Sequence, residues 1–354
     1  MGHVINWNNT LDSIMKDDDR KSDALVWASE IRVHEGHLII PTKYVKPFKS
    51  DFRNGDTGHV VLPSFDNGEV SLNLSDRAIT QMCGRLEIPP RYMKRKMAEG
   101  AWNVVDLAIR DDLERHGDRV LLRLKGTTVR AVLSMKYTRL NNADIIEDIV
   151  NLVGDKGRVK SMHLDSDGLW VKALFDGLDF VGADGQTYHV GMMIGNSEVG
   201  SRSVSVEPFI YRLSCTNDLV VAWDDAFRHR HIYIDRAQLR MGLRKAIASA
   251  VRAGDKMVDQ IELACEEEIE DPLKVIEKVA KKARYSQKFT DTVKESYEGE
   301  PMANKWGVIN AFTAAAQNLE GDRRVDVERM AGNLLIAPDI TRFKMPTQVA
   351  DSTN

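Results

Sequence analysis

The feature that most constrains the fold is the segment of residues 202–216, in which side chains alternate one by one between two faces. Apolar and polar residues alternate up to Pro208, which is the two-residue period of a strand with one buried face. Because proline donates no hydrogen bond to a strand ladder, we expect the first strand to end at Pro208 and a second extended segment to follow. In that second segment, Arg212 falls on the face opposite Tyr211. The pattern predicts a buried β-hairpin.

A polar turn precedes this alternating segment. It contains Gly195, Asn196, Ser197 and Gly200. Glycine lets a backbone approach a ligand or another chain closely, so the turn fits a binding loop as well as the end of a buried hairpin. The local pattern favours the hairpin, and the binding loop stays open as an alternative.

Helical and extended patterns occupy separate stretches elsewhere. Helical spacing and capping residues predict two short helices within residues 74–98, then helices at 103–115, 141–153, 235–268, 273–283, 287–297, 305–319 and 325–335. Strands are expected at 119–124, 128–134, 159–164, 169–175 and 187–194. The fold class is therefore α+β: antiparallel β-hairpins with flanking helices, followed by a long helix and a C-terminal helical region.

Four regions follow from these patterns. Residues 1–57 are mixed and predict a loosely packed N-terminal arm or edge elements, and residues 58–234 predict the α+β core. Residues 235–337 hold the long helix and the helical region, and 338–354 form a mobile tail. In the long helix, apolar residues step by four and three from Leu243 to Ala264, which favours an ordinary packed core helix over a coiled coil.

Composition leaves the partner open. The net charge is −4, from 49 basic and 53 acidic residues, so only a local patch can attract nucleic acid. Three widely spaced cysteines form neither a disulfide framework nor a zinc signature, which suits a reducing compartment. With no secretory signal pattern and no long apolar run, we expect a cytoplasmic protein without a membrane partner.

Two groups of basic residues are the candidate nucleic-acid contacts. The first lies in or beside the hairpin at residues 119–134. The second lies at residues 226–252, a stretch that contains seven basic residues and one acidic residue. Two further arginines come from the alternating segment. The candidate binding residues are Arg123, Lys125, Arg130, Lys136, Arg139, Arg202, Arg212, Arg228, Arg230, Arg236, Arg240 and Arg244. Candidate stacking groups are Tyr211, Trp223 and Phe227.

No catalytic motif is present: a P-loop, a dinucleotide fingerprint, a nucleophile elbow, an HEXXH pair and paired cysteines are all missing from the sequence. The histidine pair at 34 and 37 has no further ligand near it, and the guanidinium charges beside His229 and His231 oppose the binding of a cation there. Asp165, Asp167 and Asp176 are interpreted as turn residues. We therefore expect no catalytic residue, no metal and no cofactor.

Four segments carry a resemblance to a known family. They are LSDRAITQMCGRLEIPPRYMKR, LSMKYTRLNNADIIEDI, GNSEVGSRSVSVEPFIYRLSCTN with the RHRH that follows it, and WGVINAFTAAAQNLEGDRRVDVERMAGNLL. Together they resemble the phage and plasmid family catalogued as domain of unknown function number 932, across most of residues 74–335. More loosely, hairpins followed by a long helix resemble the single-strand annealing proteins of phages, which assemble as rings or helices and bind DNA along a basic groove.

The first hypothesis for function is a non-enzymatic protein that binds or anneals single-stranded DNA in phage or plasmid recombination, as a homo-oligomeric ring or filament. A metal-dependent nuclease or hydrolase is the second, with Glu198 or Asp224 acting alongside His229 or His231. The third is a structural or host-interaction protein that counters host defence.

Overall fold

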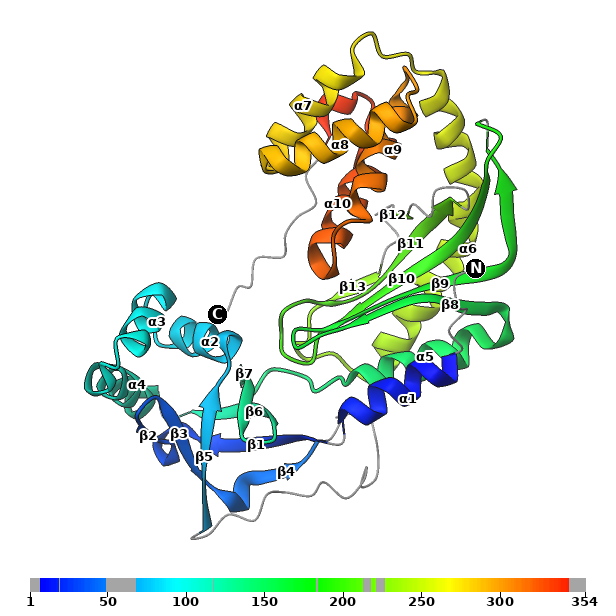
Figure 1. Ribbon diagram of the computed structural model, residues 1–354. Coiled ribbons are helices and arrows are strands. Elements are labelled where there is room, and N and C mark those ends of the chain that lie inside the picture. Colours follow the sequence, from blue (N-terminus) through cyan, green and yellow to red (C-terminus); the bar gives the residue numbers. More distant parts are fainter. Residues whose placement is uncertain are drawn as a thin grey trace.

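The computed structural model describes residues 7–18, 20–48, 68–116, 118–182, 184–212, 218–220 and 227–343. The chain forms two sheets in sequence order and then a group of helices (Figure 1). The first sheet lies at the lower left of the view, the second at the right, and the C-terminal helices at the top.

The first sheet is mostly antiparallel and has seven strands in the order β2-β3-β5-β7-β6-β1-β4. Its strands are β1 (Lys21–Trp27), β2 (Arg32–His34), β3 (His37–Pro41), β4 (Val45–Pro47), β5 (Glu69–Leu74), β6 (Arg119–Lys125) and β7 (Thr128–Ser134). The helices α2 (Asp76–Arg85), α3 (Pro90–Ala98) and α4 (Trp102–His116) share a core with this sheet. The predicted hairpin at 119–134 is thus confirmed as β6 and β7.

Local chemistry explains where α2 begins and α3 starts. The Ser75 hydroxyl accepts a hydrogen bond from the Ala78 N–H at 3.1 Å, so it caps the first turn of α2. Pro90 occupies the first position of α3, where its missing N–H leaves no helical bond unmade. α2 packs on β7, and its Arg77 and Gln81 side chains bind Asp167 and the Val199 carbonyl in loops of the second sheet.

The second sheet has six strands and is antiparallel throughout. Five of them follow the order β12-β11-β10-β9-β8. The sixth, β13, pairs with β11 along the same edge as β12. They are β8 (Gly157–Leu164), β9 (Leu169–Val181), β10 (Thr187–Asn196), β11 (Val204–Arg212), β12 (Asp218–Val220) and β13 (Phe227–His229). The helices α1 (Trp7–Asp18), α5 (Asn142–Val153) and α6 (Arg236–Glu266) bury one face of this sheet in a common core.

The expectation that a strand ends at Pro208 is wrong. β11 runs through Pro208, which is in register with Met192 of β10. On the other side of β11, β13 pairs with residues 204–206 and β12 with residues 209–211. Pro208 therefore lies at the junction of the two short partners, where a missing ladder donor costs little.

The C-terminal helices pack together and against the second half of α6. They are α7 (Pro272–Lys282), α8 (Gln287–Gly299), α9 (Lys305–Ala316) and α10 (Gly321–Ile336), and a 3₁₀ turn, η5 (Ile340–Arg342), follows. Three further 3₁₀ turns are η1 (Ala28–Glu30), η2 (Thr42–Tyr44) and η4 (Gly154–Lys156). In α6 the predicted seam is buried at Leu243, Ala250, Met257, Ile261 and Ala264, which confirms a packed core helix.

The α+β fold class with a C-terminal helical region is confirmed, but the chain regions mix more than expected. Residues 21–47 are not a loose arm, because Ala24, Val26 and Leu38 are fully buried in the first sheet, but the alternative of edge elements holds for β2 and β4, the two edge strands of that sheet. Residues 58–234 contribute to both sheets rather than to one core. The expected mobile tail is wrong at its start, because Ile340 and Phe343 are buried in the core of the C-terminal helices, and residues 344–354 lie outside the described residues. No helix in the described ranges combines the length and apolarity needed to cross a bilayer.

Candidate nucleic-acid interface

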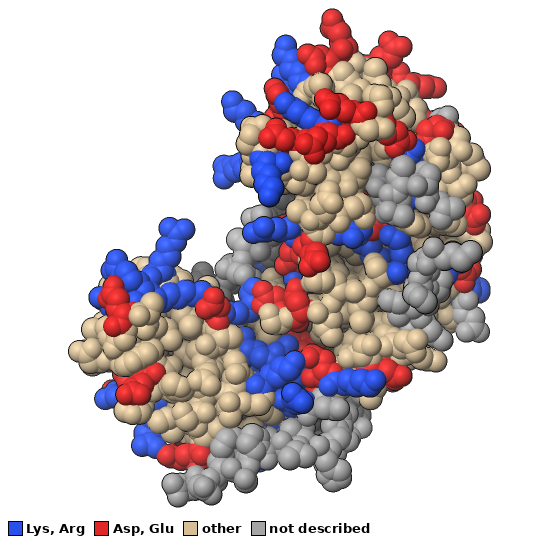
Figure 2. Space-filling view, viewed as in Figure 1, with Lys and Arg blue, Asp and Glu red and all other residues tan. Residues whose placement is uncertain are grey.

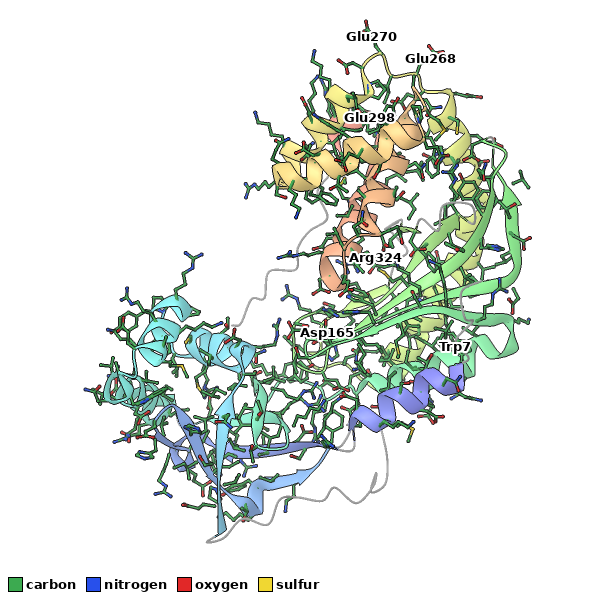
Figure 3. The ribbon with its side chains drawn as sticks, in the orientation of Figure 1. Trp7, Asp165, Glu268, Glu270, Glu298 and Arg324 are labelled. Atoms are coloured by element: carbon green, nitrogen blue, oxygen red, sulfur yellow. The ribbon has the colours of Figure 1, made fainter. Side chains whose placement is uncertain are left out.

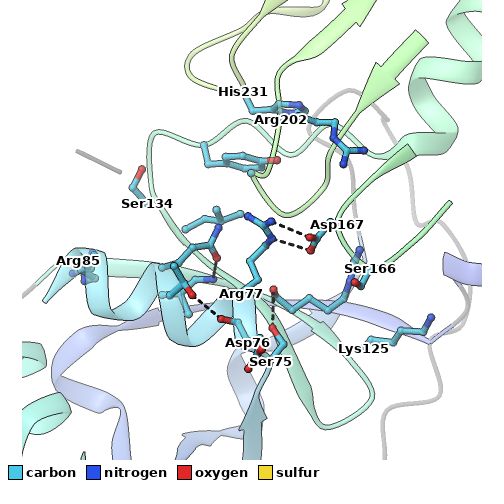
Figure 4. A pocket seen from close by; sticks show the side chains of 18 of the residues that line it. Ser75, Asp76, Arg77, Arg85, Lys125, Ser134, Ser166, Asp167, Arg202 and His231 are labelled. Carbon is cyan, nitrogen blue, oxygen red and sulfur yellow. Dashed lines mark hydrogen bonds and ion pairs between the residues drawn. The ribbon is translucent and has the colours of Figure 1, made fainter. Parts of the chain in front are cut away.

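A cleft of about 1310 Å³ separates the two sheets. One wall is formed by α2 and β7, and the other by residues 164–167, 200–203 and 230–232 (Figure 4). The cations that line it are Arg77, Arg85, Lys94, Lys125, Arg130, Arg202 and Arg230. Acids line it as well, at Asp17, Asp76, Glu87, Asp118, Asp165 and Asp167. The availability of each cation therefore depends on whether an acid already pairs with it.

A buried carboxylate joins the two walls behind the cleft. Glu198 Oε2 lies 2.9 Å from Lys21 Nζ and 3.1 Å from Arg130 Nη2, and its other oxygen accepts the Asn142 N–H at 2.9 Å. Burial by itself raises the pKa of the Glu198 carboxyl, but Lys21, Arg130 and Arg123 together hold it well below its usual range. Glu198 is thus an ionised anchor between β1, β7 and the start of α5.

Arg123 belongs to the same buried network. Its side chain is 0% exposed, and its guanidinium donates to Asp23 at 3.0 Å and to Asn141 Oδ1 at 2.6 Å. A third bond, of 3.1 Å, goes to the Glu198 carbonyl. The polar turn at 195–201 is therefore the joint at which the second sheet is fastened to the first.

The cleft wall beside this turn contains a stacked pair of rings. Tyr137 and His231 lie with centroids 5.1 Å apart and planes 4° apart, and the Tyr137 hydroxyl donates to the Ser197 carbonyl at 2.8 Å. Gly200 adopts φ +73° next to them, and an added Cβ would lie 3.1 Å from Leu133 Cδ2 and 3.7 Å from Tyr137 Cε2. Glycine is needed here because the left-handed backbone and the close approach both disfavour a side chain.

Burial, followed by the charge of Arg123, lowers the pKa of His231 to about 4. The imidazole is therefore neutral at pH 7. The nearby Thr138 backbone acts to raise the pKa of the ring, against burial and Arg123. Neither ring nitrogen has a partner in hydrogen-bonding geometry within the described residues. His231 is only 4% exposed, so these nitrogens are costly to leave without partners.

On the opposite wall, three polar side chains of α2 repeat every four residues. Arg77 forms a double ion pair with Asp167, at 2.8 and 2.9 Å (Figure 4). Gln81 donates to the Val199 carbonyl and accepts from the Val132 N–H. Arg85 comes last, and its Nε and Nη2 are buried without a partner among the described residues. A spacing of four places all three on one face of the helix.

Unpartnered side-chain atoms concentrate at this cleft. Four of its lining residues, Arg85, Arg130, Arg202 and His231, carry buried nitrogens without a hydrogen-bond partner in the described part of the chain. Buried polar groups in folded proteins are nearly always paired. The cleft therefore has unused hydrogen-bonding capacity in the described structure.

The structure brings four of the predicted contact residues together in the cleft: Lys125, Arg130, Arg202 and Arg230. Lys125 is 46% exposed beside Asp17, and Arg202 pairs with Asp322 and lies over the Trp170 ring. Lys136 and Arg139 follow β7 outside the cleft lining, with Arg139 Nη1 3.9 Å from Asp23. The remaining candidates lie elsewhere.

Arg212 is buried, contrary to the expectation that its side chain is accessible. It is 3% exposed and its guanidinium pairs with Glu300 at 2.6 Å. Arg228 pairs with Glu207, and Arg240 with Asp148 at 2.5 Å. Arg244 is exposed on α6, away from the cleft. The Arg236 side chain lies outside the described residues.

Between the second sheet and α10, further lysine and arginine side chains form buried ion pairs with acids. Asp218 lies 2.7 Å from Lys172 Nζ and 2.9 Å from Arg324 Nη2, and Figure 3 shows Arg324 on α10 beside the sheet. Burial acts against ionisation, but Lys172 and Lys160 lower the pKa of Asp218 to about 2. Arg329 of α10 similarly pairs with Glu207. This layer holds the helices on the sheet.

The other predicted groups have structural surroundings. Tyr211 lies under Lys160 Nζ, 3.9 Å from its ring centroid, and Phe227 packs against Gly242 of α6. Trp223 and Asp224 lie outside the described residues. Glu198 forms buried ion pairs with Lys21 and Arg130, so it is not free to act as the catalytic acid of the hydrolase alternative. No group of three or more potential ligands in the described ranges is arranged to hold a metal ion.

Arg77, Arg85 and Tyr137 are cleft residues that were not among the sequence candidates. The spacing of Arg77, Gln81 and Arg85 was visible in the sequence, but only the position of β7 shows that this face of α2 meets a second wall.

No family model, curated protein or solved structure matches the chain. The resemblance to the phage and plasmid family stays a prediction.

Proposed function

We propose that the protein binds single-stranded DNA in the cleft between its two sheets, without catalysing a reaction on it. Strand annealing in phage or plasmid recombination, within the cytoplasm and as a homo-oligomer, is the biological role that the family resemblance implies. The binding proposal itself depends on the cleft.

The observation that carries this proposal is the set of arginines and lysines that line one cleft, three of which have guanidinium nitrogens without a hydrogen-bond partner in the described part of the chain. A guanidinium binds phosphate oxygens through paired N–H donors, and a phosphate backbone supplies such oxygens at regular intervals. Lys125 and Arg230, also in the lining, add positive charge at the cleft wall.

The shape of the molecule agrees with a long ligand. Figure 2 shows a hollow between the first sheet with its helices and the C-terminal helices, with Lys and Arg side chains on both rims. On α3, Tyr92 is 40% exposed, and Arg95 and Lys96 lie 5.6 and 5.8 Å from its ring centroid. An exposed aromatic ring flanked by cations is a typical contact for single-stranded nucleic acid.

The test is fluorescence anisotropy of a labelled oligothymidylate, with the same sequence as a duplex for comparison. We expect binding at low salt that weakens steeply as salt rises, because counterions are released from the phosphates. Gel analysis of the same mixtures with magnesium, manganese or zinc reveals any cleavage. Lack of binding at low salt refutes the proposal, and cleavage refutes its non-catalytic part.

A further inference from the structure

Beside the cleft, one tyrosine side chain is turned toward solvent. The Tyr233 side chain is 72% exposed, and no large apolar side chain in the described ranges is more exposed. Main-chain hydrogen bonds fix its place, because the Tyr233 N–H donates to the Lys136 carbonyl at 3.3 Å. The Thr138 N–H in turn donates to the His231 carbonyl at 2.8 Å. Ile232, the preceding residue, lines the cleft, so Tyr233 lies at the edge of the cleft.

The backbone at Tyr233 has a conformation that tyrosine rarely adopts. Its φ is +52°, and of the four non-glycine residues with positive φ among the described residues it is the only aromatic one. This left-handed conformation disfavours a bulky side chain, whereas glycine and asparagine adopt it readily. His231 and Ile234 are each 4% exposed, so buried side chains on both sides fix the bend. The fold requires the bend, but an exposed tyrosine ring is not what stabilises it.

Two more exposed apolar side chains and a cation surround Tyr233. Ile232 and Met135 are 39% and 53% exposed. An antiparallel bridge joins Ile232 to Tyr137, so the two chain segments lie side by side. Lys136 is exposed, and no acid among the described residues pairs with it. Met135, Lys136, Ile232 and Tyr233 therefore form a small apolar and positively charged surface that continues the cleft wall, here called the Tyr233 surface.

The chemistry of the Tyr233 surface suits a nucleic-acid base. Every base has a flat face that can stack on an aromatic ring, and the neighbouring phosphate is attracted to a nearby cation. The exposed acid that follows, Asp235, caps α6 by accepting the Gln238 N–H at 2.9 Å. A stable protein interface involves about 20–30 residues on each side, whereas the apolar part of the Tyr233 surface consists of three side chains. A DNA base therefore fits this surface better than a protein partner does.

We propose that Tyr233 stacks on a base of the DNA strand where the strand passes the edge of the cleft, and that Lys136 attracts the adjacent phosphate. This inference rests on the proposed function. The backbone on both sides of Tyr233 is fixed before a strand arrives, so binding does not have to order it. The other possible occupant of the Tyr233 surface is a second copy of this chain, and the experiment distinguishes the two.

The experiment measures oligothymidylate affinity of the full chain by anisotropy, across a series of salt concentrations. Tyr233→Phe keeps the ring, Tyr233→Leu keeps an apolar side chain without a ring, and Tyr233→Gly removes the side chain and relieves the positive φ. Leu107→Ala is the matched control, because Leu107 is 66% exposed on α4 and does not line the cleft. Thermal melting checks the fold of each variant, and light scattering measures its mass in solution.

We expect Tyr233→Leu and Tyr233→Gly to bind about tenfold more weakly at every salt concentration, which is the effect of losing one stacked base. The slope of log affinity against log salt should not change, because a base contact releases no counterions. Tyr233→Phe and Leu107→Ala should bind as the wild type does. Tyr233→Gly should melt no lower than the wild type, which excludes unfolding as the cause of weaker binding.

Wild-type affinity in both Tyr233→Leu and Tyr233→Gly overturns the stacking contact and leaves the proposed function intact. A wild type that binds no oligonucleotide refutes the proposed function, and the stacking contact with it. If Tyr233→Leu keeps its affinity but has a smaller mass in solution than the wild type, the Tyr233 surface contacts a second copy of the chain, which also overturns the inference.

Discussion

Lys21 Nζ lies 2.9 Å from Glu198 Oε2 in the protein interior, although 177 residues separate them. Both side chains are essentially unexposed, at 1% and 0%. This pair fastens β1 of the first sheet to the turn that leads into β11 of the second. The geometry of the cleft between the sheets therefore depends on a buried charge pair.

Replacing Glu198 by glutamine is expected to destabilise the protein by about 3 kcal/mol, because Arg130 then keeps a buried charge without its counterion and Lys21 is left with Asp17 and Asp18 alone. Chemical denaturation of the purified variant measures the free energy of unfolding. The matched control is Glu69→Gln, which removes an exposed pair with Arg32 and should cost no more than about 1 kcal/mol. Equal losses in the two variants would show that Glu198 is not a structural anchor.

Acid should destabilise the protein through His231. Its folded pKa is about 4 against an ordinary value of 6.5, so between these pH values the unfolded chain binds a proton that the folded protein does not. Stability is therefore full above about pH 6.5 and falls as the pH drops toward 4.

The charged groups near the ring, Arg123 and Glu198, keep their charges in a His231→Phe variant, and His229 is present in both proteins. That variant is expected to lose the part of the pH dependence that His231 supplies, and its melting temperature at pH 7 should not fall, because two unpartnered nitrogens are removed. Unfolding curves at several pH values compare the two proteins. Parallel pH profiles would contradict the assignment to His231.

Gly195 is expected to tolerate no side chain. A Cβ there would lie 2.1 Å from Trp170 Cζ3 in the neighbouring strand, so Gly195→Ala should destabilise by about 1–3 kcal/mol through overpacking. Gly299→Ala is the control, since nothing lies within 4 Å of the added Cβ; because Gly299 is the last residue of α8, we expect the free energy of unfolding to change by no more than about 0.5 kcal/mol. A neutral Gly195→Ala in thermal denaturation would mean that β9 and β10 are less tightly packed.

Arg212 distinguishes a structural cation from a binding one. Arg212→Ala should destabilise by about 2 kcal/mol, because it leaves Glu300 and Asp184 without their shared cation in a half-buried site. The folded variant should bind oligonucleotide as tightly as the wild type, since Arg212 does not line the cleft. A large loss of affinity with unchanged stability would restore Arg212 as a contact residue.

The sequence predicted the elements well because periodicity and capping are local. Ser75 caps α2 and Asp235 caps α6 as their positions suggest, and the long helix packs through the predicted seam. Pro208 was misread because its cost depends on β12 and β13, which no local pattern places beside it.

The functional assignment of cations was harder for a physical reason. Whether an arginine binds a ligand depends on which acid reaches it, and these acids are distant in sequence: Glu300 is 88 residues from Arg212, and Asp23 is 100 residues from Arg123. Conversely, the sequence does not show that buried nitrogens of Arg85 and His231 have no hydrogen-bond partner among the described residues, because this depends on which groups the fold brings near them.

The most direct test of strand binding in the cleft compares two sets of charge removals. One variant combines Arg85→Gln, Lys125→Gln and Arg230→Gln in the cleft lining, and the other combines Arg244→Gln, Lys245→Gln and Arg252→Gln on the exposed side of α6. The measurement is oligothymidylate affinity across a series of salt concentrations. We predict that the cleft variant binds more weakly and that its slope of log affinity against log salt is shallower by about 2, while the α6 variant keeps the wild-type slope. The opposite pattern, with loss in the α6 variant alone, would contradict binding in the cleft.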